Sequence, residues 1–211
     1  MTVNLRRLRA VVIACPLLLT MTACGLLETK VVAPAIFVLA PVASAANSSP
    51  VHRDVDLVIA VPVPMPGLDT ERIETIHDAR RLDYYQEAVW GATAPHVVQA
   101  LLVASLQNQN QFRSVTAEQA RVSATHLLDL QLRDFQAEYS QAGGVPTVRV
   151  TLIGIVIRLK DRKLLASFPA TISVRADENR LSAVIAAFES AAQQVAVLVG
   201  EQSHRIVTGD N

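Results

Sequence analysis

Cys24 is the side chain with the clearest potential for chemistry near the start of this 211-residue chain, because a thiol can be acylated, oxidised or bound to a metal. Three arginines within the first nine residues precede an almost purely apolar stretch, Ala10–Thr22. At roughly 1.5 Å per residue this stretch is too short to cross a hydrocarbon core of ~30 Å as a stable helix. A basic segment followed by a short apolar one and small residues is typical of a secretory signal peptide, so residues 1–23 are predicted to be removed.

The sequence Met21-Thr22-Ala23-Cys24 resembles the lipobox of bacterial lipoproteins, in which the thiol is acylated before the signal peptidase cuts. The resemblance implies that Cys24 is the lipid-bearing first residue of the mature protein, with palmitate among its acyl chains. Cys15 also follows small residues, but it would leave only a few apolar residues after the arginines. Gly25 stands where an aspartate commonly retains lipoproteins in the inner membrane, so the expected location is the periplasmic face of the outer membrane.

Removal of residues 1–23 changes the composition of the chain. It takes away one of the two cysteines and three of the 19 basic residues, which leaves 16 basic against 19 acidic side chains and a formal charge of −3. The mature domain therefore offers no disulfide and no thiolate metal site. A mildly acidic chain has no electrostatic footprint for nucleic acid or for an anionic bilayer, so membrane attachment is expected to come from the lipid.

Catalytic motifs are absent from the sequence. It contains no Gly-x-Ser-x-Gly elbow, no phosphate-binding loop that ends in Lys-Ser/Thr, and no His-Glu-x-x-His. The five histidines are scattered, and one of them, His126, shares a strand face with Leu128 and Leu130, which favours a hydrogen-bonded core histidine over a ligand. The sequence therefore predicts a protein that is not an enzyme and that holds neither a cofactor nor a metal.

Large aromatic residues gather beside a segment rich in proline and glycine. Tyr84, Tyr85 and Trp90 follow Pro66–Ile73. Tyrosine and tryptophan are common anchors of binding surfaces, because they bury apolar area while a polar tip keeps a hydrogen bond. The three residues are the candidate partner-binding residues, with packing in the core as the competing interpretation for each of them and most of all for Trp90.

Two helices are predicted from apolar residues that recur every three or four positions. In the first, Thr93 can cap the start and Pro95 sits in the first turn. The second begins near Leu181, where Asp177 or Asn179 can cap it, and Gly200 fits its end. The apolar stripe of the first helix consists of Val97, Val98, Leu101, Leu102 and Leu106.

Strands are predicted before and between these helices. Phe37–Leu39 and Val55–Val63 are candidate early strands, and the prolines after the second one stop regular structure. Between the helices the period changes to two, around Leu128–Leu132, Val148–Leu152 and Leu164–Val174, with turns at Gly143-Gly144 and at residues 160–162. These three strands are predicted to form an antiparallel meander. The expected fold class is α+β, a single domain in which two helices pack on one face of an antiparallel sheet.

The mature chain divides into three predicted parts. Residues 24–34 are a lipidated tether, residues 35–200 are the folded domain, and residues 201–211 are a C-terminal tail. A domain of this length can bury a core of its own.

The mature chain resembles the ABC-type transport auxiliary lipoproteins, which include the lipoprotein of the paraquat-inducible operon. The resemblance spans nearly the whole mature chain through short elements in a fixed order. These elements are Cys24, Phe37-Val38-Leu39, Pro66–Ile73, Tyr84-Tyr85 with Trp90 and Pro95, Phe112 with Val115, Leu130–Glu138, and Ala187-Phe188 with Ala191. Position 37 is phenylalanine where the family leads us to expect tyrosine.

The resemblance implies a non-catalytic role in intermembrane lipid transport. Proteins of this kind act with an MCE-domain periplasmic protein and an ABC permease and ATPase, so the chain is expected to be the partner anchored in the outer membrane. Two other functions stay open from the sequence, a structural or assembly lipoprotein of the cell envelope and a periplasmic small-ligand binder. The sequence leaves open which lipid is transported and in which direction. It also leaves open the oligomeric state, with a homo-oligomer as one of the alternatives.

Overall fold

The computed structural model describes residues 33–44 and 54–210. Residues 34–211 form one compact unit, and every element below belongs to it. The signal peptide 1–23, Cys24 and the tether as far as residue 32 lie outside the described residues, and their assignment stays a prediction.

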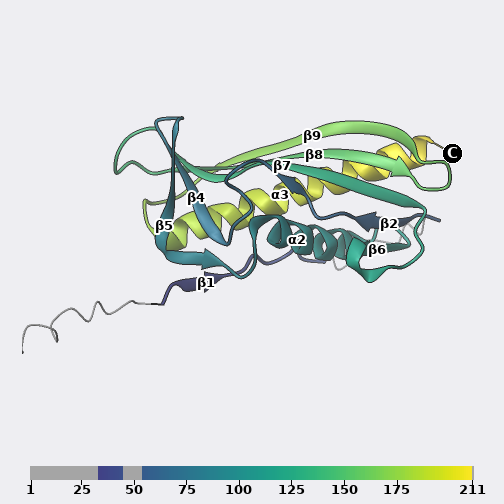
Figure 1. Ribbon diagram of the computed structural model, residues 1–211, viewed down its shortest axis with the longest axis horizontal. Helices are drawn as coiled ribbons and strands as arrows, with labels where there is room; N and C mark the ends of the chain where they lie inside the picture. The colour runs from purple at the N-terminus through teal and green to yellow at the C-terminus, as the bar shows by residue number, and fades with distance from the viewer. Residues whose placement is uncertain (1–32, 45–53, 211) are drawn as a thin grey trace, which may run out of the picture. The chain divides into compact units, whose positions relative to one another are not determined.

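Three long strands form one side of a nine-stranded sheet. Strand β7 (His126–Tyr139) pairs antiparallel with β8 (Thr147–Arg158), and β8 pairs antiparallel with β9 (Lys163–Arg175). Figure 1 shows the three strands side by side. The predicted meander is therefore confirmed, because the period of two in the sequence places apolar side chains on the one face that is buried.

Irregularities in pairing change which residues face the core. A register shift in β7 between Leu132 and Asp134 inserts one residue, so the buried positions move from even numbers to odd numbers, beginning with Phe135. A second shift, between Val156 and Ile157 of β8, pairs Leu164 with Ile157. Leu164 is consequently 58% exposed, and its predicted place on the core face is wrong.

The other edge of β7 carries three short strands one after another. They are β2 (Asp56–Ile59), β3 (Val63–Pro64) and β4 (Arg72–His77), and each runs parallel to β7. The sheet is therefore mixed, and the prediction of an antiparallel sheet is wrong in this respect. The reason is the long crossover between β4 and β7, which contains a helix and lets the chain re-enter the sheet in the same direction.

Three more strands complete the sheet. Strand β5 (Arg81–Trp90) pairs antiparallel with β4, β1 (Ala35–Phe37) pairs parallel with β5, and β6 (Ser114–Ala117) pairs parallel with β2. A 3₁₀ turn, η2 (Glu118–Ala120), follows β6. The first strand lies two residues earlier than predicted. The second is shorter than predicted, because prolines follow Ile59 and leave only the two-residue β3.

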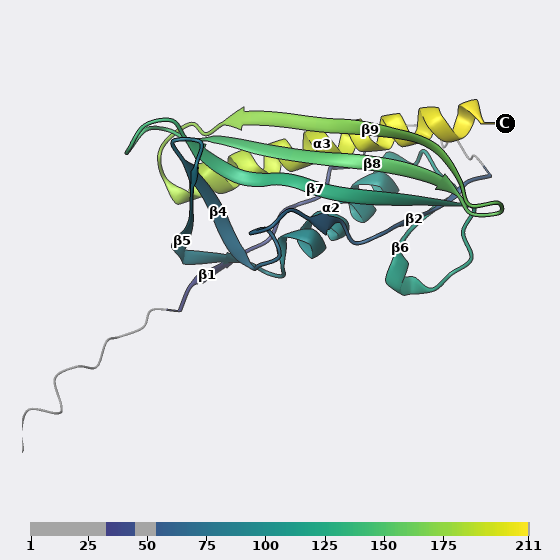
Figure 2. The same ribbon diagram turned by 45° about the horizontal axis from the view of Figure 1, so that its top comes forward.

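Two helices lie on the same side of the β7–β9 strands, as predicted. Helix α2 (Ala94–Gln109) begins after Thr93 with proline in its first turn, and its apolar stripe packs inward. Helix α3 (Leu181–Gly209) runs along β8 and β9 (Figures 1 and 2). Its predicted end at Gly200 is wrong, because the buried stripe continues through Ser203 and Val207. The residue before its first turn is Arg180, and neither predicted capping residue caps it.

Among the described residues, α3 is the one helix long and apolar enough to cross a membrane. Half of its most apolar window is buried inside the domain. Phe188, Val195 and Val199 are among its fully buried residues. The composition of α3 is therefore explained by packing against the sheet and against α2.

Candidate functional site

Trp90 lies at the centre of the core and not on a surface. Its side chain is 1% exposed, and its ring packs against Phe135 of β7 and Phe188 of α3 at centroid distances of 5.3 and 5.2 Å. The indole joins the sheet to α3. Trp90 can support a binding surface only through the position of β5.

Tyr85 lies on the helix side of the sheet in a polar cluster. Its hydroxyl is 2.6 Å from the hydroxyl of Tyr139, which donates to Oδ1 of Asn179 at 3.1 Å. The amide of Asn179 donates to the carbonyl of Gly143. Burial and the Tyr139 hydrogen bond raise the pKa of the Tyr85 hydroxyl, so it stays protonated. The cluster ties β5, β7 and the start of α3 together.

Tyr84 occupies the opposite face of β5, beside the segment Pro66–Ile73. The guanidinium carbon of Arg72 lies 3.8 Å from the centroid of the Tyr84 ring, a cation–π contact. The Tyr84 hydroxyl donates to the carbonyl of Gly67 at 3.4 Å. The structure therefore brings Tyr84 together with the proline- and glycine-rich segment and separates it from Tyr85 and Trp90.

Glu74 is a buried carboxyl group next to Tyr84, on the outer face of the sheet. It is opposite Tyr84 in the β4–β5 pairing and 4% exposed, and its Oε2 atom has no hydrogen-bond partner within residues 33–44 and 54–210. Burial, and secondarily the charge of Asp134, raise the pKa of Glu74 to about 7. Glu74 is therefore half protonated near neutral pH, a property that ordinary surface glutamates lack.

Gly67 covers this carboxyl group. Its φ of +101° favours glycine, and a Cβ atom there would lie 2.9 Å from the side chain of Leu82 and 3.3 Å from Oε2 of Glu74. The bulge in β7 brings a second carboxyl group to this face of the sheet. It turns Asp134 away from the core toward the face that holds Glu74. We call Gly67, Arg72, Glu74 and Tyr84 the outer-face cluster.

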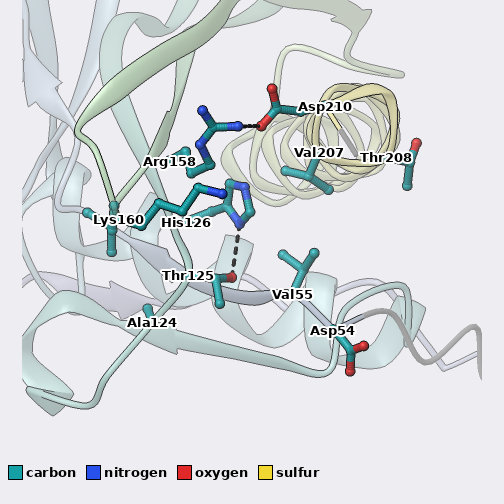
Figure 3. A pocket seen from close by; sticks show the side chains of 11 residues that line it. Asp54, Val55, Ala124, Thr125, His126, Arg158, Lys160, Val207, Thr208 and Asp210 are labelled. Carbon is teal, nitrogen blue, oxygen red and sulfur yellow. Dashed lines mark hydrogen bonds and ion pairs between the residues drawn. The ribbon is translucent and has the colours of Figure 1, made fainter.

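A second candidate site is a cavity of about 740 Å³. It lies where the C-terminal end of α3 meets the starts of β2 and β7 and the turn between β8 and β9. Figure 3 shows its lining, with Arg158 and Asp210 joined by an ion pair and His126 beside Thr125. Arg158 also pairs with Asp161, at 2.7 Å. Lys160 extends along the same wall (Figure 3). The positive charge of Arg158 is thus already compensated by two carboxylates.

His126 and Thr125 do not form a nucleophile and base pair. The Thr125 hydroxyl lies 2.9 Å from Nδ1 of His126, but it also donates to the carbonyl of Asp56 and accepts from the backbone N–H of that residue. Burial, together with the cations Arg158 and Lys160, lowers the pKa of His126 although Asp210 opposes the shift, so the ring is neutral at pH 7. The 8% exposure of His126 confirms the core position predicted from its strand face. This geometry fastens β2 to β7 and presents no activated oxygen.

The histidines and carboxylates that the structure describes do not gather into a metal site. No group of three or more His, Cys, Asp or Glu side chains able to hold an ion occurs in the described part of the chain. His77 stacks on the ring of Tyr139 at 4.8 Å, and His204 packs on Phe112. These histidines have structural contacts that explain their positions.

Sequence reasoning missed the acidic and basic members of both sites. Glu74 follows Ile73 in a strand where alternation favours an exposed acid, and nothing local marks its burial. Asp210 and Arg158 are 52 residues apart in the sequence, and their contact depends on α3 continuing past Gly200. Arg72 lies within Pro66–Ile73, the segment that the sequence places beside Tyr84. That placement was the one signal in the sequence that pointed to a charged member of either site.

Solved structures share this fold. The crystal structure of protein XCC0632 from Xanthomonas campestris, described as a DUF330 protein, matches with a TM-score of 0.74 and 20% identity, over 83% of this chain and 98% of that one. A second crystal structure, of an uncharacterized protein, matches with a TM-score of 0.64 and 10% identity, over 81% and 99% of the two chains. At these identities the similarity establishes the fold alone. No curated protein matches the chain.

The family model described as "ABC-type transport auxiliary lipoprotein component" matches residues 37–199. The matched region begins within β1, contains the outer-face cluster, and ends within α3. It covers well over half of the chain and agrees with the resemblance seen in the short sequence elements. The chain therefore belongs to the family of ABC-type transport auxiliary lipoprotein components.

Proposed function

We propose that this protein is a non-catalytic lipoprotein of an ABC transport system that moves lipids between the two membranes of the cell envelope. The observation that carries the proposal is the family match over residues 37–199, together with the lipobox-like sequence that ends at Cys24. In this function an ABC permease and ATPase supply the energy, an MCE-domain periplasmic protein is the direct partner, and this chain is the component anchored at the periplasmic face of the outer membrane.

The outer-face cluster is the proposed contact with the MCE-domain partner. Tyr84 combines a half-buried ring with a guanidinium stacked on it, and Leu82, one of the exposed large apolar residues of the domain, lies beside Gly67. Arginine and tyrosine are enriched among residues that dominate binding energy. Tyr85 and Trp90 support this surface from the other side of β5.

Co-purification with an MCE-domain protein from the same organism tests the proposal. The tagged full-length chain is expected to retain that protein, and Tyr84→Ala is expected to lose it without a change in melting temperature. Leu164→Ala is the matched control, because Leu164 is an exposed apolar residue on the distant strand β9. A native chain that never retains an MCE-domain protein, with no such gene beside its own, would favour an envelope scaffold and refute the proposal.

The anchor is tested separately. Cys24→Ser is expected to abolish metabolic palmitate labelling, because the variant has no thiol to be acylated at this position. It is expected to leave an unprocessed or soluble protein, since stable anchoring needs more than one acyl chain. Unchanged labelling in this variant would refute the assignment of Cys24. Sucrose-gradient fractionation that places the native protein wholly with inner-membrane markers would refute the outer-membrane location.

A further inference from the structure

An apolar groove runs between helix α2 and the chain that follows β1. It has a volume of about 340 Å³, within the range of small-ligand sites. One wall is formed by Val38, Leu39 and Pro41, and the other by residues of α2 that include Ala100 and Ala104. These alanines are one turn apart on the same helix face, so they leave room above the helix where larger side chains would fill it.

The wall opposite α2 is held in place by side chains from both helices. The backbone N–H of Ala40 donates to Glu189 of α3 at 2.9 Å, and its carbonyl accepts from Gln193 at 2.9 Å. The N–H and carbonyl of Val42 bind Ser105 and Asn108 of α2. The groove is therefore preformed, which lowers the entropic cost of filling it.

The chemistry of the lining points to hydrocarbon. Among the lining residues that the structure describes, His96 is the one with an ionisable side chain, and its Nδ1 is already 3.0 Å from the hydroxyl of Thr93. Next to the groove, Ile36 and Val38 are 72% and 75% exposed. Natural edge strands usually carry charge or proline at such positions, so two exposed aliphatic side chains on the edge strand and its exit indicate a surface that is covered in use.

The position of the groove in the chain identifies the occupant. Val38 is 14 residues after Cys24, so the groove lies within roughly 50 Å of the predicted lipid anchor even for a fully extended tether. The chain enters the folded domain at Pro34 and reaches the groove directly through β1. Of the apolar molecules near the anchor, the bilayer phospholipids are the most abundant.

We propose that this groove binds one acyl chain of a bilayer phospholipid, with Ile36 and Val38 at its entrance. The inference rests on the proposed function, since it gives the tethered component of a lipid-transport system a lipid site of its own. The small residues along α2 set the width of the site, and the segment 38–42 sets its length.

The experiment uses the full-length protein in vesicles of phosphatidylethanolamine and phosphatidylglycerol that contain a trace of phospholipid with a diazirine at the end of one acyl chain. After photolysis, labelled positions are mapped by mass spectrometry. Labelling is expected on residues 36–41 and 91–104. Ala100→Phe fills the groove at an exposed helix position and is expected to abolish labelling of 91–104. Ala186→Phe, at an exposed position of α3, is the matched control and is expected to keep it. Val38→Gln tests the entrance independently of α2.

Three results would overturn the proposal. Labelling confined to Ile36 and Val38, and unchanged in Ala100→Phe, would mean contact with the bilayer surface only. Cross-links between two copies of the chain in place of lipid labelling would assign the groove to a second copy. Labelling that appears only after Cys24→Ser would assign it to the protein's own acyl chain. Co-purification of Ala100→Phe with the MCE-domain partner is measured in parallel: its retention separates failure of the lipid site from failure of the proposed function.

Discussion

Substitution of Glu74 by glutamine removes the one carboxyl group of the outer-face cluster that is buried without a hydrogen-bond partner at Oε2. Glutamine has nearly the shape of a protonated glutamic acid and carries no charge at any pH. The variant should therefore pack like the native protein at low pH. At high pH it should avoid the burial of a carboxylate beside Asp134.

The magnitude follows from the pKa values of the folded and unfolded states. The pKa of Glu74 rises from 4.5 to about 7 on folding. The folded state therefore binds the proton more tightly, and raising the pH favours unfolding. The stability that protonated Glu74 provides is fully present below pH 4.5 and is lost as the pH rises through 7. Each tenfold difference in proton affinity is worth about 1.4 kcal/mol, so the total loss is about 3 kcal/mol.

Urea denaturation of both proteins at a series of pH values from 5 to 8.5 measures the difference. The native curve alone is insufficient, because the lowered pKa of His126 makes its own contribution rise with pH in part of the same window. The free energy of unfolding of Glu74→Gln minus that of the native protein should increase with pH by up to about 3 kcal/mol. Asp134→Asn should shift the midpoint of this increase to lower pH. A difference that is constant over the series, or that decreases, would refute the burial of an ionisable Glu74.

Further substitutions test the packing of the core and of the two tyrosines, each by the free energy of unfolding in urea. Gly154→Ala should cost about 1–3 kcal/mol, because the added Cβ would lie 2.5 Å from Cζ of Phe168, and Phe168→Leu in the same chain should recover part of the loss. Trp90→Ala should cost about 3–5 kcal/mol, and a loss below 1 kcal/mol would contradict its core position. Tyr85→Phe should cost about 1 kcal/mol through the lost Tyr139 hydrogen bond, whereas Tyr84→Phe should leave stability nearly unchanged.

Elements with a long and regular pattern could be predicted from the sequence. The α2 stripe and the β7–β9 alternation each include several apolar residues at a fixed spacing, and tertiary packing reinforces that spacing. The end of α3 could not be placed in this way. Gly200 resembles a helix end, but here its small size lets the Gln109 side chain of α2 approach, since a Cβ atom would lie 2.4 Å from Oε1. A glycine needed for helix contact and a glycine that ends a helix look alike in one sequence.

Parallel pairing was not predictable for a different reason. The segments β2, β3 and β4 are four, two and six residues long, and prolines separate them. Each is too short to show a period, and their common direction is set by β7, in which the paired residues lie 62 or more positions later. The choice between parallel and antiparallel neighbours depends on where the crossover through α2 returns, which is a property of the whole fold.

The candidate site depends on the same kind of non-local information. Simple alternation along β5 would place Tyr84 on the face of Ala88 and Trp90, and Tyr85 on the other. The pairing with β4 shifts by three residues between Arg72 and Glu74, and Figure 1 shows β5 bending along its length. Because the shift is an odd number, Tyr85 faces the helices and Tyr84 the outer surface. An irregularity without a glycine or proline to mark it thus decides which aromatic ring a partner can reach, and it places Tyr84 opposite the buried Glu74.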